Sequence, residues 1–213
     1  YNRRPMVHAF GRPTLPQRKD YGSSIKPVVG LKTGHRIGIV PKIGIARYTY
    51  GFRKVPYASM VQADVGFSTG THGWRANLIG DKRFESSDFH LPAIATVSQL
   101  EIVQFRGLGN DIEDSDEAFF DVKQKQWSFY PGIGFSFAPG SDLTFGPIVR
   151  STRTDSLSNN FLSQTRPYGF RTFSEAGLQM KLHFDSRLQP DSARPRFVVD
   201  FTGAGYPGMW DAK

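Results

Sequence analysis

The amino-acid sequence predicts an all-β protein built from antiparallel strands. Three observations lead to this fold class. Apolar and polar residues alternate with a period of two over segments long enough to form β-strands. Gly occurs 22 times and the aromatic residues are mostly Phe and Tyr, a composition that favours strands and turns over packed helices. No run approaches the roughly 20 apolar residues that a membrane-spanning helix needs.

The alternation is clearest between residues 175 and 184. One face of this segment carries apolar side chains and the other carries polar residues or Gly. We expect four of the apolar residues to face lipid: Leu178, Met180, Leu182 and Phe184. Comparable patterns predict about nine strands, in the following ranges: 25–33, 36–49, 59–69, 74–84, 89–105, 119–137, 143–153, 171–185 and 197–204.

The lengths of these strands favour an antiparallel transmembrane β-barrel in the bacterial outer membrane. Several runs reach about ten residues or more, whereas a typical soluble strand has about five or six. The long polar segments 107–118 and 154–170 also fall on the same side of the sheet, as the long outer loops of such barrels do. A soluble β-sandwich that acts as a binding module, with the apolar face as its core, stays open as an alternative.

The chain divides into two parts. Residues 1–24 contain Pro5, Pro13 and Pro16 with Arg and Lys between them and show no alternation, so we expect a periplasmic arm or linker. Residues 25–213 form the predicted barrel portion. Single-chain bacterial barrels have even strand numbers, so an odd count predicts part of a larger barrel. Its edge strands would then pair with further strands of the same polypeptide or with another envelope protein chain.

No catalytic, cofactor or metal site is predicted. Cys is absent, which excludes disulfides, thiolate metal sites and Cys nucleophiles. The acidic segment 111–117 lacks the spacing and Gly of an EF-hand, and Gly107–Asn110 lacks the Lys-Ser/Thr of a phosphate loop. The five histidines have no metal-ligand spacing and are expected to be solvated. His8 lies in the arm, His183 lies on a polar strand face, and three lie in or beside turns: His35, His72 and His90.

The formal net charge of +8 does not predict a nucleic-acid partner, because the basic residues are scattered singly and form no basic helix or arm. Asp185 and Arg187 lie two residues apart at a strand end, so their side chains share one face and can pair with neighbouring charges. An exposed ion pair of this kind contributes little to stability.

Three segments resemble a known family. YTYGFRKVPYASMVQADVGFST, at residues 48–69, resembles the first strands of surface-antigen barrels. QFRGLGN, at residues 104–110, resembles the strand end before an acidic loop in these barrels. LHFDSRLQP, at residues 182–190, resembles their strand-end turn, in which an Asp-x-Arg element precedes a Pro. The chain thus resembles the bacterial surface-antigen superfamily of outer-membrane assembly factors, and most of all the branch fused to a calcineurin-like phosphoesterase domain.

The resemblance implies a non-enzymatic barrel that inserts or translocates polypeptides, or that anchors a periplasmic domain. It implies a barrel of about sixteen strands and a register-fixing turn at Asp185, Arg187 and Pro190. Two departures stand against it: the Gly that usually follows this turn is replaced around residues 193–195, and the Val-Arg-Gly-Tyr/Phe lumen motif is missing. A structural or pore subunit of a larger envelope complex is the alternative.

Overall fold

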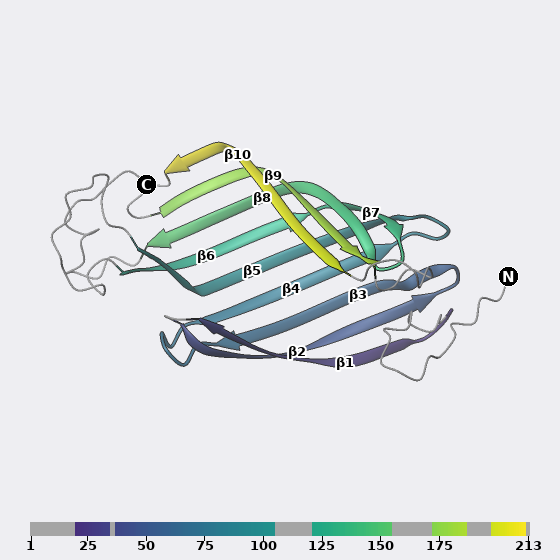
Figure 1. Cartoon of the computed structure of the whole chain (residues 1–213), viewed down its shortest axis with the longest axis horizontal. Helices are drawn as coiled ribbons and strands as arrows, with labels where there is room; N and C mark the ends of the chain where they lie inside the picture. Colours follow the sequence, from purple (N-terminus) through teal and green to yellow (C-terminus); the bar gives the residue numbers. More distant parts are fainter. Residues whose placement is uncertain (1–19, 35–36, 105–120, 155–171, 187–196, 212–213) are drawn as a thin grey trace.

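The chain forms one antiparallel sheet of ten strands, as a computed structural model describes it for residues 20–34, 37–104, 121–154, 172–186 and 197–211. Figure 1 shows the strands running obliquely across a sheet that curls instead of lying flat. The predicted all-β antiparallel class is therefore confirmed. No α-helix occurs among the described residues, and none of their segments is a helix able to cross a membrane.

Neighbouring strands in the sheet follow one another along the chain, so the topology is a meander. The strands are β1 (Ser23–Gly34), β2 (Gly38–Gly51), β3 (Lys54–Phe67), β4 (Trp74–Arg83), β5 (Phe89–Gln104), β6 (Asp121–Pro131), β7 (Ile133–Ala138), β8 (Ser141–Thr154), β9 (Thr172–Asp185) and β10 (Val198–Asp211). Among the described residues, β1 pairs only with β2 and β10 only with β9. Barrel closure is therefore not observed within the part of the chain that the structure describes.

The predicted strand 119–137 is divided at Gly132 into β6 and β7. The amide of Gly132 donates a hydrogen bond to the carbonyl of Pro92 on β5, 2.8 Å away. Beyond this point β7 pairs with both β5 and β8, so β6 and β7 together occupy one position in the sheet. This interruption explains why the structure has ten strands where the sequence predicted about nine.

Two other boundaries differ from the prediction because Pro does not end these strands. The connection between the predicted strands 36–49 and 59–69 is a tight turn at Phe52 and Arg53, where Arg53 adopts a positive φ of 56°. The strand β3 therefore includes Pro56. Likewise β10 continues past residue 204 through a register shift between Gly205 and Gly208. Pro is tolerated on an edge strand or at a bulge, where its missing N–H removes no ladder bond.

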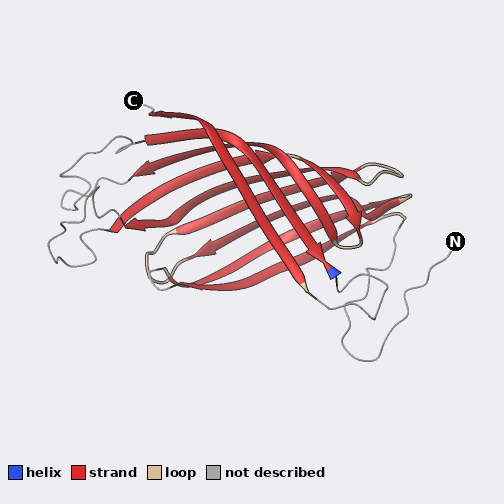
Figure 2. Cartoon of the chain, turned by 45° about the horizontal axis from the view of Figure 1, so that its top comes forward, coloured by secondary structure: helices blue, strands red, loops and turns tan. Residues whose placement is uncertain are grey.

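The strand directions gather the long connections at one end of the sheet. Gln104 pairs with Asp121, and Arg153 pairs with Thr172, so both long connections begin and end at this end of the strands. The opposite end of the strands carries the short turns at 52–53, 84–88 and 139–140. Figure 2 shows the curled sheet from a second direction, with β9 and β10 crossing in front of the earlier strands.

The two faces of the sheet differ in chemistry. Cross-strand pairing assigns each residue to one of the two faces. The side that we call the outer face carries Ile43, Val61, Leu78, Phe129 and Leu178. The other side, the inner face, carries Lys42, Gln62, Asn77, Ser128 and Gln179. The named outer residues are all exposed. Charged and polar residues are buried instead, Asp64 and Asp81 among them. This arrangement inverts the usual distribution in a water-soluble domain.

Close backbone packing on the inner face makes Gly44 sensitive to substitution. A Cβ at this position would lie 2.5 Å from Cβ of Asp64 and would also meet the carbonyl of Ala63. A Cβ at Gly80 would meet nothing within 4 Å. We expect Gly44→Ala to lower the free energy of unfolding by about 1–3 kcal/mol. Gly80→Ala should change it by less than about 0.5 kcal/mol in the same denaturant titration. Equal effects of the two substitutions would contradict the packing described.

Candidate functional site

The inner face carries a buried polar cluster, which we call the Asp81 cluster, formed by Tyr57, Asp81, Arg83 and His90. The Tyr57 hydroxyl donates a hydrogen bond to Asp81 Oδ2 at 2.7 Å. His90 Nδ1 lies 2.7 Å from Asp81 Oδ1, and Arg83 Nε lies 3.3 Å from Asp81 Oδ2. Asp81 is 7% exposed and His90 4% exposed. Three strands, β3, β4 and β5, therefore meet at one carboxylate.

The surroundings of His90 point to a packing role. A Cβ at Gly134 on β7 would overlap Nε2, Cε1 and Cδ2 of the His90 ring, so only a Gly leaves room for it. Arg83 extends the cluster to the same strand, because its Nη1 donates a hydrogen bond to Ser136 Oγ at 2.9 Å. The ring edge that a general base would present to a substrate is thus covered by backbone. This geometry suits a role in fixing the register of β4, β5 and β7.

A second cluster is centred on Asp64, which is 5% exposed. Gln62 Nε2 donates to Oδ2 at 2.8 Å, and Asn77 Nδ2 donates to Oδ1 at 2.7 Å. Thr96 Oγ1 donates in turn to Asn77 Oδ1 at 3.1 Å. The ammonium of Lys42 lies 3.8 Å from Asp64 Oδ1, which is beyond hydrogen-bond length. The two amides therefore supply the hydrogen bonds of this carboxylate.

Further along the sheet, polar contacts continue across β6, β8, β9 and β10. Arg150 Nη1 donates to Glu175 Oε1 at 2.9 Å, and its guanidinium carbon lies 5.2 Å from the centre of the Tyr206 ring. The Lys181 ammonium lies 4.7 Å from the centre of the Tyr130 ring. An ion pair and two cation–aromatic contacts thus stabilise the charges of Arg150, Glu175 and Lys181 locally.

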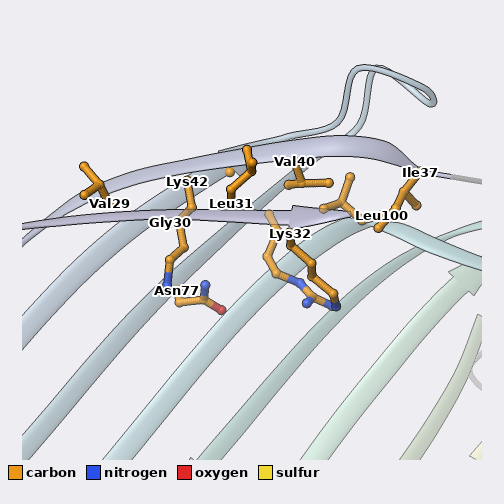
Figure 3. Close-up of a pocket in the computed structure, with 11 residues that line it drawn as sticks. Val29, Gly30, Leu31, Lys32, Ile37, Val40, Lys42, Asn77 and Leu100 are labelled. Carbon is orange, nitrogen blue, oxygen red and sulfur yellow. The ribbon is translucent and has the colours of Figure 1, made fainter. Parts of the chain in front are cut away.

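One cavity opens on the inner face beneath β1 and β2. Its volume is about 460 Å³. Figure 3 shows Lys32 and Lys42 extending from these strands toward the inner side, with the Lys42 side chain reaching toward Asn77. Arg75 on β4 also lines the cavity. The lining thus combines three cationic side chains and an amide with two glycines and five apolar residues: Val29, Leu31, Ile37, Val40 and Leu100.

The residues predicted to face lipid lie on the outer face of β9. Leu178 is 52% exposed and Met180 40% exposed. Leu182 and Phe184 are half-buried. Phe184 is covered by two rings, because its centre lies 6.2 Å from that of Phe137 and 5.5 Å from that of Phe197. Contact of these four residues with lipid stays a prediction.

The predicted structural turn is only partly described. Asp185 is buried at the end of β9, and its amide donates a hydrogen bond to Ser141 Oγ at 3.0 Å. Arg187 and Pro190 lie outside the described residues, as do the acidic segment 111–117, Gly107–Asn110 and most of the predicted arm 1–24. Within the part of the chain that the structure describes, no three His, Asp, Glu or Cys residues are grouped so that they could hold a metal ion.

Sequence reasoning missed the Asp81 cluster, and the expectation of a solvated His90 was wrong. The signal was present in the turn at 84–88. Because this turn pairs Arg83 with His90 and Asp81 with Pro92, Asp81 and His90 share one face as diagonal neighbours. The register of this hairpin therefore predicts that a carboxylate and an imidazole lie next to each other.

Removing the Asp81 carboxylate should destabilise the fold strongly. Asp81→Ala leaves Tyr57 and His90 without their hydrogen-bond partner and Arg83 without its counter-charge, so we expect a loss of about 3–5 kcal/mol in unfolding free energy. The matched control is Asp200→Ala, since Asp200 pairs with His183 at 2.6 Å but its side chain is 74% exposed. That change should cost less than about 1 kcal/mol. Urea titration of both variants checks the difference, and a tolerated Asp81→Ala would refute the structural role.

Comparison with known proteins gives no neighbour for this arrangement: no family model, curated protein or solved structure matches the chain.

Proposed function

We propose that this chain is the barrel portion of an outer-membrane β-barrel protein, non-enzymatic in this region, whose outer face meets lipid. The observation that carries the proposal is the inverted distribution of polarity. Large apolar side chains are exposed along the outer face of successive strands, while carboxylates, amides and hydroxyls are buried on the inner face. Outer-membrane barrels alternate in this way, with an apolar band outside and a polar interior.

Water is a poor solvent for such an outer face. Ile43, Val61, Leu78, Phe129 and Leu178 lie on β2, β3, β4, β6 and β9. The exposed Val97 on β5 and Phe145 on β8 lie on the same face between them, so the exposed side chains form a continuous surface. Monomeric soluble proteins rarely expose contiguous apolar patches larger than a few hundred Å². Removing apolar surface from water contributes roughly 25 cal/mol per Å², and a bilayer provides this gain without a second protein layer.

An aromatic row at the short-turn end of the sheet favours the same environment. Phe89 and Phe135 have ring centres 5.1 Å apart, and the stacked rings of Phe137 and Phe184 continue the row. Outer-membrane barrels carry girdles of aromatic residues where the apolar band ends. The row therefore fits one margin of a lipid-facing band.

A soluble β-sandwich fits the fold less well. A sandwich needs a second sheet whose inner face covers the first. The described strands form a single sheet, and its apolar side has no second layer over it among these residues.

The open edges extend the proposal to a larger barrel. In hydrocarbon each unpaired N–H or C=O of an edge strand costs several kcal/mol, so an exposed edge is not tolerated there. We propose that β1 and β10 pair with further strands of a longer polypeptide. A pore or structural subunit whose edges pair with another envelope protein chain is the second candidate, since the same edges would serve it.

The activity of the complete barrel follows only from the sequence resemblance. Surface-antigen barrels insert or translocate polypeptides or anchor a periplasmic domain, and we propose one of these roles here. A hydrated lumen lined by side chains such as Gln62, Asn77 and Lys42 is compatible with passage of polar backbone. The packing of the Asp81 cluster, in which the ring of His90 lies against Gly134, supports a structural role for this cluster.

Arginine substitution on the two faces of β3 tests the lipid-facing proposal. Val61 is exposed on the outer face, while the neighbouring Gln62 lies on the inner face beside Asp64. For protein folded in liposomes, we expect Val61→Arg and Leu178→Arg to cost about 2–4 kcal/mol near the bilayer midplane. Gln62→Arg should cost less than about 1 kcal/mol, because the new cation meets a carboxylate and a hydrated lumen.

Detergent dependence provides the second readout for this proposal. The protein should leave solution when detergent is removed and should be recovered in the liposome fraction. A monomer that stays soluble without detergent, and in which Gln62→Arg is as harmful as Val61→Arg, would contradict a lipid-facing outer surface.

A further inference from the structure

The outer face changes from apolar to cationic toward the long-connection end of β6 and β8, two strands that lie side by side (Figure 1). The exposed Phe129 and Trp127 occupy outer positions of β6, and the next outer positions are Lys125 and Lys123. Arg153 on β8 pairs with Lys125 and shares its face. All three cationic residues are exposed. We call Lys125 and Arg153 the outer cation pair.

The outer cation pair lies at the margin of the apolar band opposite to the aromatic row. Leu143 pairs with Phe135 of that row, and Arg153 follows Leu143 by ten positions on β8. Ten positions extend about 33 Å along a strand, which a barrel tilt of about 40° converts into a depth of about 25 Å. The apolar band of an outer-membrane barrel is also about 25 Å tall. The pair thus matches the depth at which hydrocarbon meets lipid head groups.

Like charges meet in the outer cation pair. Lys125 and Arg153 stand directly opposite each other, a position in which Cβ atoms are roughly 5 Å apart and like charges repel. Within the described part of the chain, no ion pair joins either residue to a carboxylate. Asp121 shares their register but lies four positions from Lys125, about 13 Å along β6. An anion from outside the protein would therefore relieve the repulsion.

We propose that the outer cation pair binds the phosphate head group of an anionic membrane lipid, an inference that rests on the lipid-facing outer surface proposed above. Lys125 and Arg153 approach one phosphate from neighbouring strands, and a guanidinium binds phosphate through two parallel hydrogen bonds. The exposed Lys123 adds a third positive charge two positions away. The acyl chains of the same lipid contact the apolar outer residues Trp127 and Phe129, contacts that a free phosphate cannot make.

Fluorescence quenching of Trp127 measures which lipid occupies this position. The full chain, in a variant that keeps only this Trp, is folded in phosphatidylcholine vesicles that contain brominated phosphatidic acid or brominated phosphatidylcholine, at constant ionic strength. The ratio of the two binding constants gives the lipid preference beside β6. We expect a preference of about fivefold for phosphatidic acid, the effect of a cation near a charged head group. Replacing the pair by Lys125→Gln and Arg153→Gln should reduce the ratio to about one.

Lys82→Gln is the matched control, because Lys82 is exposed on the same face but lies at the short-turn end of β4, opposite Ser59 and Leu91. It should leave the ratio unchanged, and circular dichroism establishes that each variant is folded. Equal quenching by both lipids before any cation is replaced, or an equal fall in the control and the pair variant, would overturn the head-group site and leave the lipid-facing surface intact. Quenching by neither lipid would contradict both.

Discussion

The structure depends on a continuous ladder of antiparallel backbone hydrogen bonds that stays in register across a single curved layer. This register places apolar outer residues such as Ile43 and Val65 opposite each other, and inner polar residues such as Asp64 and Asn77 opposite each other. A shift by one residue in any strand would move its whole apolar set to the opposite face. The Asp64 and Asp81 clusters stabilise the register, because each joins neighbouring strands through a buried carboxylate.

The same ladder explains where Gly is required. Gly44 allows its strand to approach Ala63 and Asp64 closely, and Gly134 makes room for the ring of His90. Small residues on the inner face thus let the sheet curl while large polar side chains fill the space between them. Bulky apolar residues occupy the outer, convex side, where curvature separates neighbouring side chains. The curl and the segregation of polarity are therefore two consequences of one residue pattern.

Much of this arrangement could be predicted from the sequence, because alternation reports directly which face a residue occupies. The faces of Leu178 and Met180 and the turns around Ser86 and Gly140 follow from local pattern and turn chemistry. The break at Gly132 could not be predicted, since it depends on pairing with Pro92 on another strand. The Asp81 cluster depends on a register that the alternation leaves open. Alternation also carries no information about what pairs with the outer edges of β1 and β10.

The central claim, that the outer face meets lipid, is tested most directly by the fluorescence of Trp127, which is exposed on the outer face of β6. In liposomes, a variant that keeps only this Trp should be quenched by brominated acyl chains and protected from aqueous acrylamide. A Trp placed at the neighbouring inner position by Gln126→Trp, in a background without other Trp, should behave in the opposite way. Quenching of Trp127 by acrylamide but not by brominated lipid would contradict the account.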